Sequence, residues 1–280
     1  MKQILNLGGL VAVALTALVG CSNETIAPTD INTYFEPKKG DTFTYARYER
    51  DSNNARMESS KTVHKWAVIE TNLNYKSKNS VAKILQLNFD ATGTSKTSPD
   101  DTIYLASLAD GTIYMNVASA TVGRIPLAAP FASEIPFEWF QIGDTKSAGA
   151  YEFQSLAGSG IAKDVSYEVG PPIGTLNLRI SITSKAKHKG KIATQVGTTL
   201  YPSSFHTDHD VRMKAVLIGL TGDTIVDDTL NLGYDIDPAK GIVRQTMASQ
   251  TVVAMLPLLG ARPEKVAGYE MELIGVVRAQ

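Results

Sequence analysis

The stretch FHTDHDV, residues 205–211, holds a dense group of side chains of the types that bind metals. In an extended strand His206, Asp208 and Asp210 would share one face, while His209 would point to the other. Such nitrogen and oxygen ligands suit zinc or a harder ion. Alternate residues of a strand lie about 6.6 Å apart, so three of them cannot reach one ion without ligands from elsewhere. We therefore predict no metal site, interpret the stretch as a polar loop before the next strand, and rank a metal-dependent hydrolase as the least favoured function.

Three other patterns that could support chemistry are incomplete. YDIDPAKG lacks the oxygen ligand and the glycine that a calcium loop needs at its fifth and sixth positions, so it predicts a turn set by Pro238 and Gly241. LAGSGIA places a serine between two glycines, but without the spacing of a nucleophile elbow. Ser184 and Lys187 have Ser-x-x-Lys spacing in a stretch typical of a strand, where the lysine cannot lie beneath the serine. We predict that the protein is not an enzyme and has no cofactor.

Cys21, the only cysteine, follows an apolar segment. One positive charge, Lys2, and an apolar stretch over residues 10–19 are typical of a secretory signal, and the stretch is shorter than the roughly 20 residues of a spanning helix. A lone cysteine cannot form an intrachain disulfide. The sequence LVGC at residues 18–21 resembles the lipobox of bacterial lipoproteins. This resemblance implies cleavage between Gly20 and Cys21, attachment of a diacylglycerol to the Cys21 thiol, and acylation of the new amino terminus.

Three acyl chains would hold the protein on a membrane firmly, because each buried methylene adds about 0.8 kcal/mol. In enterobacteria-like sorting an Asp after the cysteine retains lipoproteins in the inner membrane, and here Ser22 follows, so we expect the outer membrane. The sequence leaves open which face of that membrane carries the protein. Residues 22–33 are polar and indicate a tether that spans about 40 Å at most. The expected organisation is a signal peptide at 1–20, a lipidated N-terminus and flexible tether at 21–33, and a single β-rich domain at 34–280.

The balance of charge excludes a nucleic-acid partner. Of the 27 basic residues, removal of Lys2 leaves 26, against 28 acidic residues, so the mature chain is weakly negative.

From residue 34 onward, apolar and polar residues alternate in short runs separated by Gly, Pro, Asn and Asp, which is the pattern of β-strands. Asp110-Gly111 predicts a tight turn, and SKAKHKGK predicts a hairpin with Gly190 at its bend. Short helical turns are expected at 132–140 and 255–261. Strands are expected at 42–50, 61–71, 81–90, 102–108, 112–118, 151–155, 165–169, 174–184, 191–200, 211–219, 224–232, 242–254 and 266–277. Without helical crossovers these strands should pair antiparallel. The prediction is an all-β fold, a strongly curved antiparallel sheet or unclosed β-barrel with one or two short helices.

The phrases YFEPKKGDTFTYARYE, DDTIYLASLADGTIYMN and YDIDPAKGIVRQTMAS resemble, in this order, landmarks of uncharacterised β-rich envelope lipoproteins of bacteria. The resemblance covers most of residues 34–277. It implies a curved sheet similar to that of the periplasmic lipoprotein-carrier proteins, and it implies no established activity.

Two function classes follow. In the first, a membrane-anchored, non-enzymatic envelope lipoprotein binds an apolar or lipid-like ligand on a concave β surface. The apolar segment 125–140 could form a lid over this ligand, with Phe131, Phe137, Trp139 and Phe140 as its lining. In the second, a structural lipoprotein docks onto an envelope protein assembly through exposed strands or the loop at 255–262. Both classes contact the membrane through the N-terminal lipid.

Overall fold

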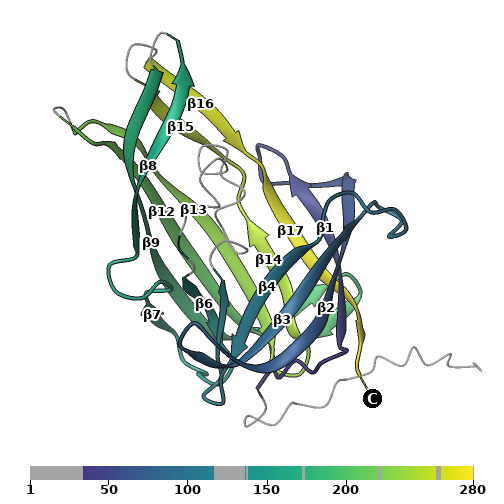
Figure 1. The fold of residues 1–280 in the computed structure, drawn as a ribbon. Coiled ribbons are helices and arrows are strands. Elements are labelled where there is room, and N and C mark those ends of the chain that lie inside the picture. Colours follow the sequence, from purple (N-terminus) through teal and green to yellow (C-terminus); the bar gives the residue numbers. More distant parts are fainter. Residues whose placement is uncertain are drawn as a thin grey trace, which may run out of the picture.

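The computed structural model describes residues 34–116, 136, 138–171, 174–219, 222–256 and 260–279. Cys21, Gly20, Phe131 and Phe137 lie outside these residues. The described chain forms the following strands (Figure 1): β1 Thr42–Arg50, β2 Arg56–Tyr75, β3 Lys78–Phe89, β4 Asp101–Ser107, β5 Thr112–Asn116, β6 Trp139–Asp144, β7 Tyr151–Phe153, β8 Ile161–Gly170, β9 Gly174–Lys191, β10 Thr194–Val196, β11 Thr199–Tyr201, β12 Phe205–Leu217, β13 Thr224–Asp237, β14 Gly241–Met247, β15 Gln250–Leu256, β16 Gly260–Val266 and β17 Gly268–Val277.

Thirteen strands build one curved sheet. Twelve of them follow the order β6-β5-β4-β3-β2-β1-β17-β14-β13-β12-β9-β7, and the thirteenth, β8, pairs with a different part of β9 than β7 does. Two hairpins, β10–β11 and β15–β16, form separate small sheets. Neighbouring strands pair antiparallel, as the absence of helical crossovers predicted. Among the described residues, no helix is long and apolar enough to span a membrane.

The expected helical turns are wrong where the structure describes them. At the end of the first, Trp139 and Phe140 begin β6, because alternate side chains of this strand are buried while its backbone pairs with β5. At the second, β15 runs to Leu256 and β16 starts at Gly260, and the two strands pair as a hairpin. No helix occurs within the described ranges.

The bend expected at Gly190 is also wrong, because β9 continues as a strand through Lys191. Along its length Leu178, Ile180 and Ile182 are buried, and the residues between them are exposed or half-buried. The same alternation extends through the lysine-rich part of the strand. In contrast, the turn at Asp110-Gly111 is confirmed, with the Gly111 N–H donating to the Leu108 carbonyl at 2.9 Å.

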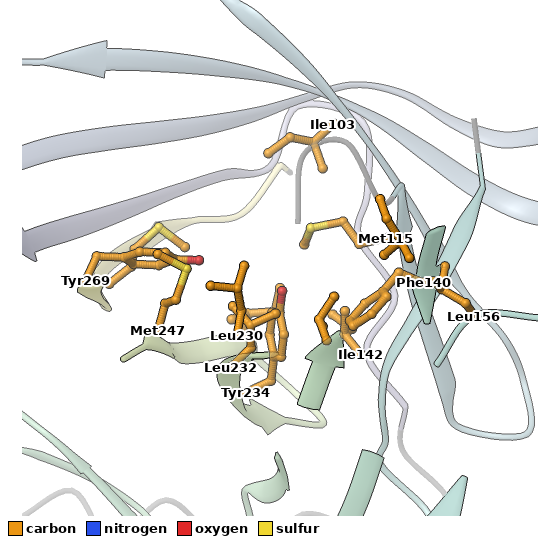
Figure 2. Packing of buried hydrophobic residues seen from close by; sticks show 14 of the residues in the cluster. Ile103, Met115, Phe140, Ile142, Leu156, Leu230, Leu232, Tyr234, Met247 and Tyr269 are labelled. Carbon is orange, nitrogen blue, oxygen red and sulfur yellow. The ribbon is translucent and has the colours of Figure 1, made fainter. Parts of the chain in front are cut away.

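Alternation gives the sheet an inner face, whose side chains are buried together, and an outer face, whose side chains are mostly polar and exposed. Figure 2 shows the inner face at the centre of the molecule, where Tyr234, Met247 and Tyr269 pack in the same cluster as Phe140 and Ile142. These five side chains are at most 1% exposed. The burial of one continuous apolar face therefore holds the two halves of the curved sheet together.

The two ends of the sheet meet where β6 lies beside the segment after β7. Phe140 of β6 forms an isolated bridge with Leu156, just after β7, and the Gln141 N–H donates to the Ser155 carbonyl at 2.8 Å. No ladder of hydrogen bonds joins β6 to β7 in the described chain, so the sheet curls round without closing.

Candidate functional site

A groove of about 730 Å³ crosses the outer face over β7, β9, β12, β13 and β14. Its volume lies in the range of small-molecule binding sites. The groove is lined by side chains and backbone of Arg50, Glu152, Phe153, Gln154, Lys185, Ala186, Lys187, Asp208, His209, Asp210, Asn231, Leu232, Gly233, Thr246 and Ala248.

The strand register places the polar lining residues of the groove in rows across the sheet. Glu152 pairs with Lys187, and Lys187 pairs with Asp208. In the next row Lys185 lies opposite Asp210, and Asp210 lies opposite Asn231. Positive and negative side chains therefore alternate from strand to strand along the groove.

Gly233 continues the first row and leaves the groove open at its centre. It lies between Asp208 of β12 and Thr246 of β14. A Cβ atom at this position would lie 2.7 Å from the Thr246 Oγ1, closer than van der Waals contact allows. A larger residue would therefore fill the groove and push Thr246 aside.

A chain of ion pairs borders the groove. The Lys189 Nζ lies 2.5 Å from the Asp208 carboxylate, and His206 binds Asp208 through Nε2 at 2.8 Å and Asp235 through Nδ1 at 2.7 Å. The Arg244 Nε donates to the other Asp235 oxygen at 2.7 Å. Lys185 and Lys187 form no ion pair within the described residues, so their charges are available to a ligand in the groove.

In this row of ion pairs, the pKa shifts of His206 and Asp235 favour the charged form of each side chain. Burial lowers the pKa of His206, but its bonds to Asp235 and Asp208 outweigh burial, and the net pKa is raised. Burial likewise raises the pKa of Asp235, whereas His206 and Arg244 lower it, and the net pKa falls below the usual value. The charges therefore hold one another in place beside the groove.

The structure tests the prediction for FHTDHDV. His206 and Asp208 are half-buried and Asp210 is exposed on the outer face, while His209 is buried on the inner face, as a strand requires. The interpretation as a loop is wrong, because β12 already begins at Phe205. Both ring nitrogens of His206 are bonded to carboxylates. Within the described ranges, no three His, Cys, Asp or Glu side chains converge as a metal site.

His209 instead forms a buried pair with Ser155. The Ile142 carbonyl, which can only accept, lies 3.2 Å from Nε2, so this nitrogen carries the proton. Nδ1 then accepts from the Ser155 hydroxyl at 2.7 Å. Burial among the rings of Phe140 and Tyr234 lowers the pKa of His209 to about 4, so the imidazole is neutral. This pair links β12 to β6 and to the segment after β7.

The turn at Pro238 and Gly241 is confirmed, since β13 ends at Asp237 and β14 begins at Gly241. The Asp237 Oδ1 accepts hydrogen bonds from the N–H groups of Ala239 and Lys240, which fixes the turn.

Two of the four expected lid residues lie in the described chain. Phe140 is fully buried, and its ring centroid lies 5.0 Å from that of His209. Trp139 is half-buried, and its Nε1 donates to the Lys76 carbonyl at 2.7 Å. Both belong to β6, a strand of the main sheet. Phe131 and Phe137 lie outside the described residues, so the lid stays a prediction.

Sequence reasoning missed the groove. The charges at every second position of SKAKHKGK and FHTDHDV indicated two polar strand faces. Their place side by side depends on the register of β9 against β12, which the sequence of either strand alone does not specify.

Comparison with known protein families and with curated proteins finds no match for this chain. Two solved structures are similar to it. One, from Bacteroides fragilis, is assigned as an exported protein with a YmcC-like fold; it is 12% identical, with a TM-score of 0.43, over 88% of this chain and 100% of that one. The other, from Parabacteroides distasonis, is assigned as a lipoprotein; it is 10% identical, with a TM-score of 0.47, over 89% of this chain and 100% of that one.

Proposed function

We propose that the protein is a non-enzymatic lipoprotein of the bacterial cell envelope, anchored in the outer membrane by lipid on Cys21, which binds a polar ligand in the outer-face groove. The lipobox sequence LVGC and the serine that follows it support the anchor and the membrane. The groove of about 730 Å³, with Lys185 and Lys187 unpaired within the described residues, is the observation that carries the binding function.

The packing of the inner face favours a polar ligand over the apolar ligand expected from the sequence. The apolar cavity between β8, β9, β12, β13 and β15 has a volume of about 20 Å³, room for about one water molecule. Among the side chains around it Leu176, Met213 and Ile225 are at most 8% exposed, and the half-buried Tyr167 and Leu256 pack against this core. An acyl chain could enter only if this part of the core opened.

The geometry of the Ser155–His209 pair supports a non-enzymatic protein. Ser155 is 2% exposed and His209 is fully buried, so a substrate cannot reach the hydroxyl. The second ring nitrogen donates to a backbone carbonyl and not to a carboxylate, and burial outweighs the Ile142 carbonyl and the charge of Asp208, so the site disfavours an imidazolium. The pair serves to hold the two ends of the sheet together.

One observation favours docking onto an envelope protein as a second function. The β15–β16 hairpin pairs on itself, apart from the main sheet, and exposes Val253 by 42% and Met255 by 52%. Exposed apolar side chains on a projecting hairpin are typical of a contact site for another protein.

The binding function can be tested with arrays of immobilised envelope glycans and charged peptides. We expect the purified protein to bind a subset of these polar probes, and Lys185→Ala with Lys187→Ala to abolish that binding. Lys163→Ala with Lys265→Ala, which removes two exposed lysines outside the groove, is the matched control. Binding of a fluorescent fatty acid at one per chain, with no polar probe bound, would refute the polar groove and restore the apolar ligand.

A further inference from the structure

The loops at one end of the sheet are bonded to one another around the point where the described chain starts. The Lys146 Nζ lies 5.6 Å from the centroid of the Tyr34 ring and donates to the Ala109 carbonyl at 2.6 Å. Arg278 bonds to Asp41 and also to the Ala239 carbonyl. This anchor-side end consists of residues 34–41, 108–111, 145–150, 191–204, 238–240 and 277–279, and it is the lower end in Figure 1.

The anchor-side end presents cations to solvent. Within the described residues its five lysines form no ion pair; they are Lys38, Lys39, Lys146, Lys191 and Lys240. Its exposed carboxylates are Glu36 and Asp110. The carboxylate of Asp41 is buried and bonded to Arg278, and that of Asp237 is buried and bonded to backbone N–H groups.

Three loops at the opposite end of the sheet carry the reverse charge. They span 51–55, 90–101 and 218–223 and hold acidic residues at positions 51, 90, 100, 101 and 223. The lysine among them, Lys96, is paired with Asp100 at 2.8 Å. The β15–β16 hairpin at this end also carries two exposed cations, Arg262 and Lys265. The lysines of the anchor-side end and the carboxylates of these three loops therefore lie at opposite ends of the strands.

Apolar side chains lie among the lysines of the anchor-side end. Ile192 is 39% exposed, Leu200 is 51% exposed and Val277 is 67% exposed. Lysines beside exposed aliphatic side chains are the combination that binds the interface of an anionic membrane, where ammonium groups meet phosphates and aliphatic groups enter the headgroup layer.

We propose that the anchor-side end rests on the anionic lipid headgroups of the membrane, with the strands directed away from the surface. This inference rests on the proposed lipid anchor at Cys21, because a tether over residues 22–33 that enters the domain at Tyr34 brings this end nearest to the lipid. Each lysine near an anionic surface strengthens binding about fivefold. Three lysines together therefore contribute on the order of a hundredfold.

The acylated protein allows a site-specific test, since Cys21 is the only cysteine and its sulfur is blocked by lipid. Leu200→Cys at the anchor-side end and Met255→Cys at the far end each receive an environment-sensitive fluorophore. The labelled proteins are reconstituted into vesicles of phosphatidylcholine alone or mixed with phosphatidylglycerol. We expect a blue shift of the label at 200 in the anionic vesicles, reversed by high salt, and no shift at 255.

The charge is tested by Lys38→Gln, Lys39→Gln and Lys146→Gln in the Leu200→Cys protein, which should remove the shift. The matched control neutralises lysines 96, 163 and 265, which lie elsewhere, and should keep it. An unshifted label at 200, or an equal shift at 255, overturns the inference. Mass spectrometry of the N-terminal peptide reports acylation separately. If Cys21 is not acylated the anchor proposal fails, and the same comparison is then made with protein that also carries Cys21→Ser, added to the vesicles, where the expected and overturning results are unchanged.

Discussion

Acidification should weaken the contact that joins the two ends of the sheet, because it protonates His209. The Nδ1 atom accepts from Ser155 and Nε2 donates to the Ile142 carbonyl, so a proton added to Nδ1 reverses the Ser155 hydrogen bond and places a positive charge in a buried site. Replacement by glutamine can keep both bonds, since its amide oxygen accepts and its amide nitrogen donates, and it removes the titration.

The pKa of His209 falls from 6.5 to about 4 on folding. At 1.36 kcal/mol per pKa unit this costs the folded state about 3 kcal/mol between neutral pH and pH 4. A group whose pKa is lower in the folded state contributes stability at a pH above its unfolded-state pKa. This stability is lost as the pH falls toward its folded-state pKa. Between about pH 5 and pH 6 the unfolded chain binds nearly one proton more than the folded chain. The free energy of unfolding should therefore fall by about 1.2 kcal/mol for each unit by which the pH is lowered.

The window between about pH 5 and pH 6 separates His209 from His206, Asp208 and Asp235. Burial raises the pKa of Glu272 from 4.5, so acidification toward this window stabilises the fold through Glu272, opposite in sign to His209, and comparison with His209→Gln removes this shared contribution. The pKa of His206 is raised, so the stability that it contributes is lost above the window and is fully present below its unfolded value. The pKa values of Asp208 and Asp235 are lowered from 3.8, so their contribution is lost below the window.

Urea unfolding across this window measures the slope directly. We expect His209→Gln to flatten the dependence of the unfolding free energy on pH, and His206→Gln to leave the slope as in the wild type. A slope that His209→Gln does not change would refute the reasoning.

Three further predictions concern the anchor, the metal and a turn. Cys21→Ser should block lipidation and leave the precursor uncleaved or the protein released from membranes, and radiolabelled palmitate on this variant would contradict the anchor. The purified protein should contain no stoichiometric zinc, because His206 already bonds two carboxylates; zinc that is present and then lost with His206→Ala and Asp208→Ala would overturn this. Gly241→Ala should lower the free energy of unfolding by about 1–3 kcal/mol, because φ of Gly241 is +87° and the Phe35 ring would lie 2.7 Å from the added Cβ. Thermal or urea unfolding measures this loss, and unchanged stability would show that the turn relaxes.

Much of the fold could be predicted from the sequence, because a strand with one buried face has apolar and polar residues at alternate positions. This alternation located β1 and the first part of β9, and it placed His209 on the face opposite His206 and Asp208. One error arose where a local pattern was short. The residues WFQIGD of β6 are too few to show a period, and pairing with β5 decides their conformation.

The candidate site was largely inaccessible from the sequence for a related reason. The groove needs Glu152, Lys187, Asp208 and Thr246 in one row, and each residue comes from a different strand. A shift of one residue in any of these registers would replace a polar neighbour by a buried one. Likewise, Ser155 and His209 are brought together by the curvature of the whole sheet, which no local motif records.

The pairing of β1 with β17 determines the order in which the sheet can fold. Thr42 pairs with Val277, so β1 obtains one of its two partners only after nearly all of the chain is present. Pairings of such long range close late and slowly, and until then the edge of β1 is exposed to other chains. If the protein is exported from its N-terminus, as proposed above, folding trails export, and a holding factor that shields unpaired strand edges should raise the yield of native protein.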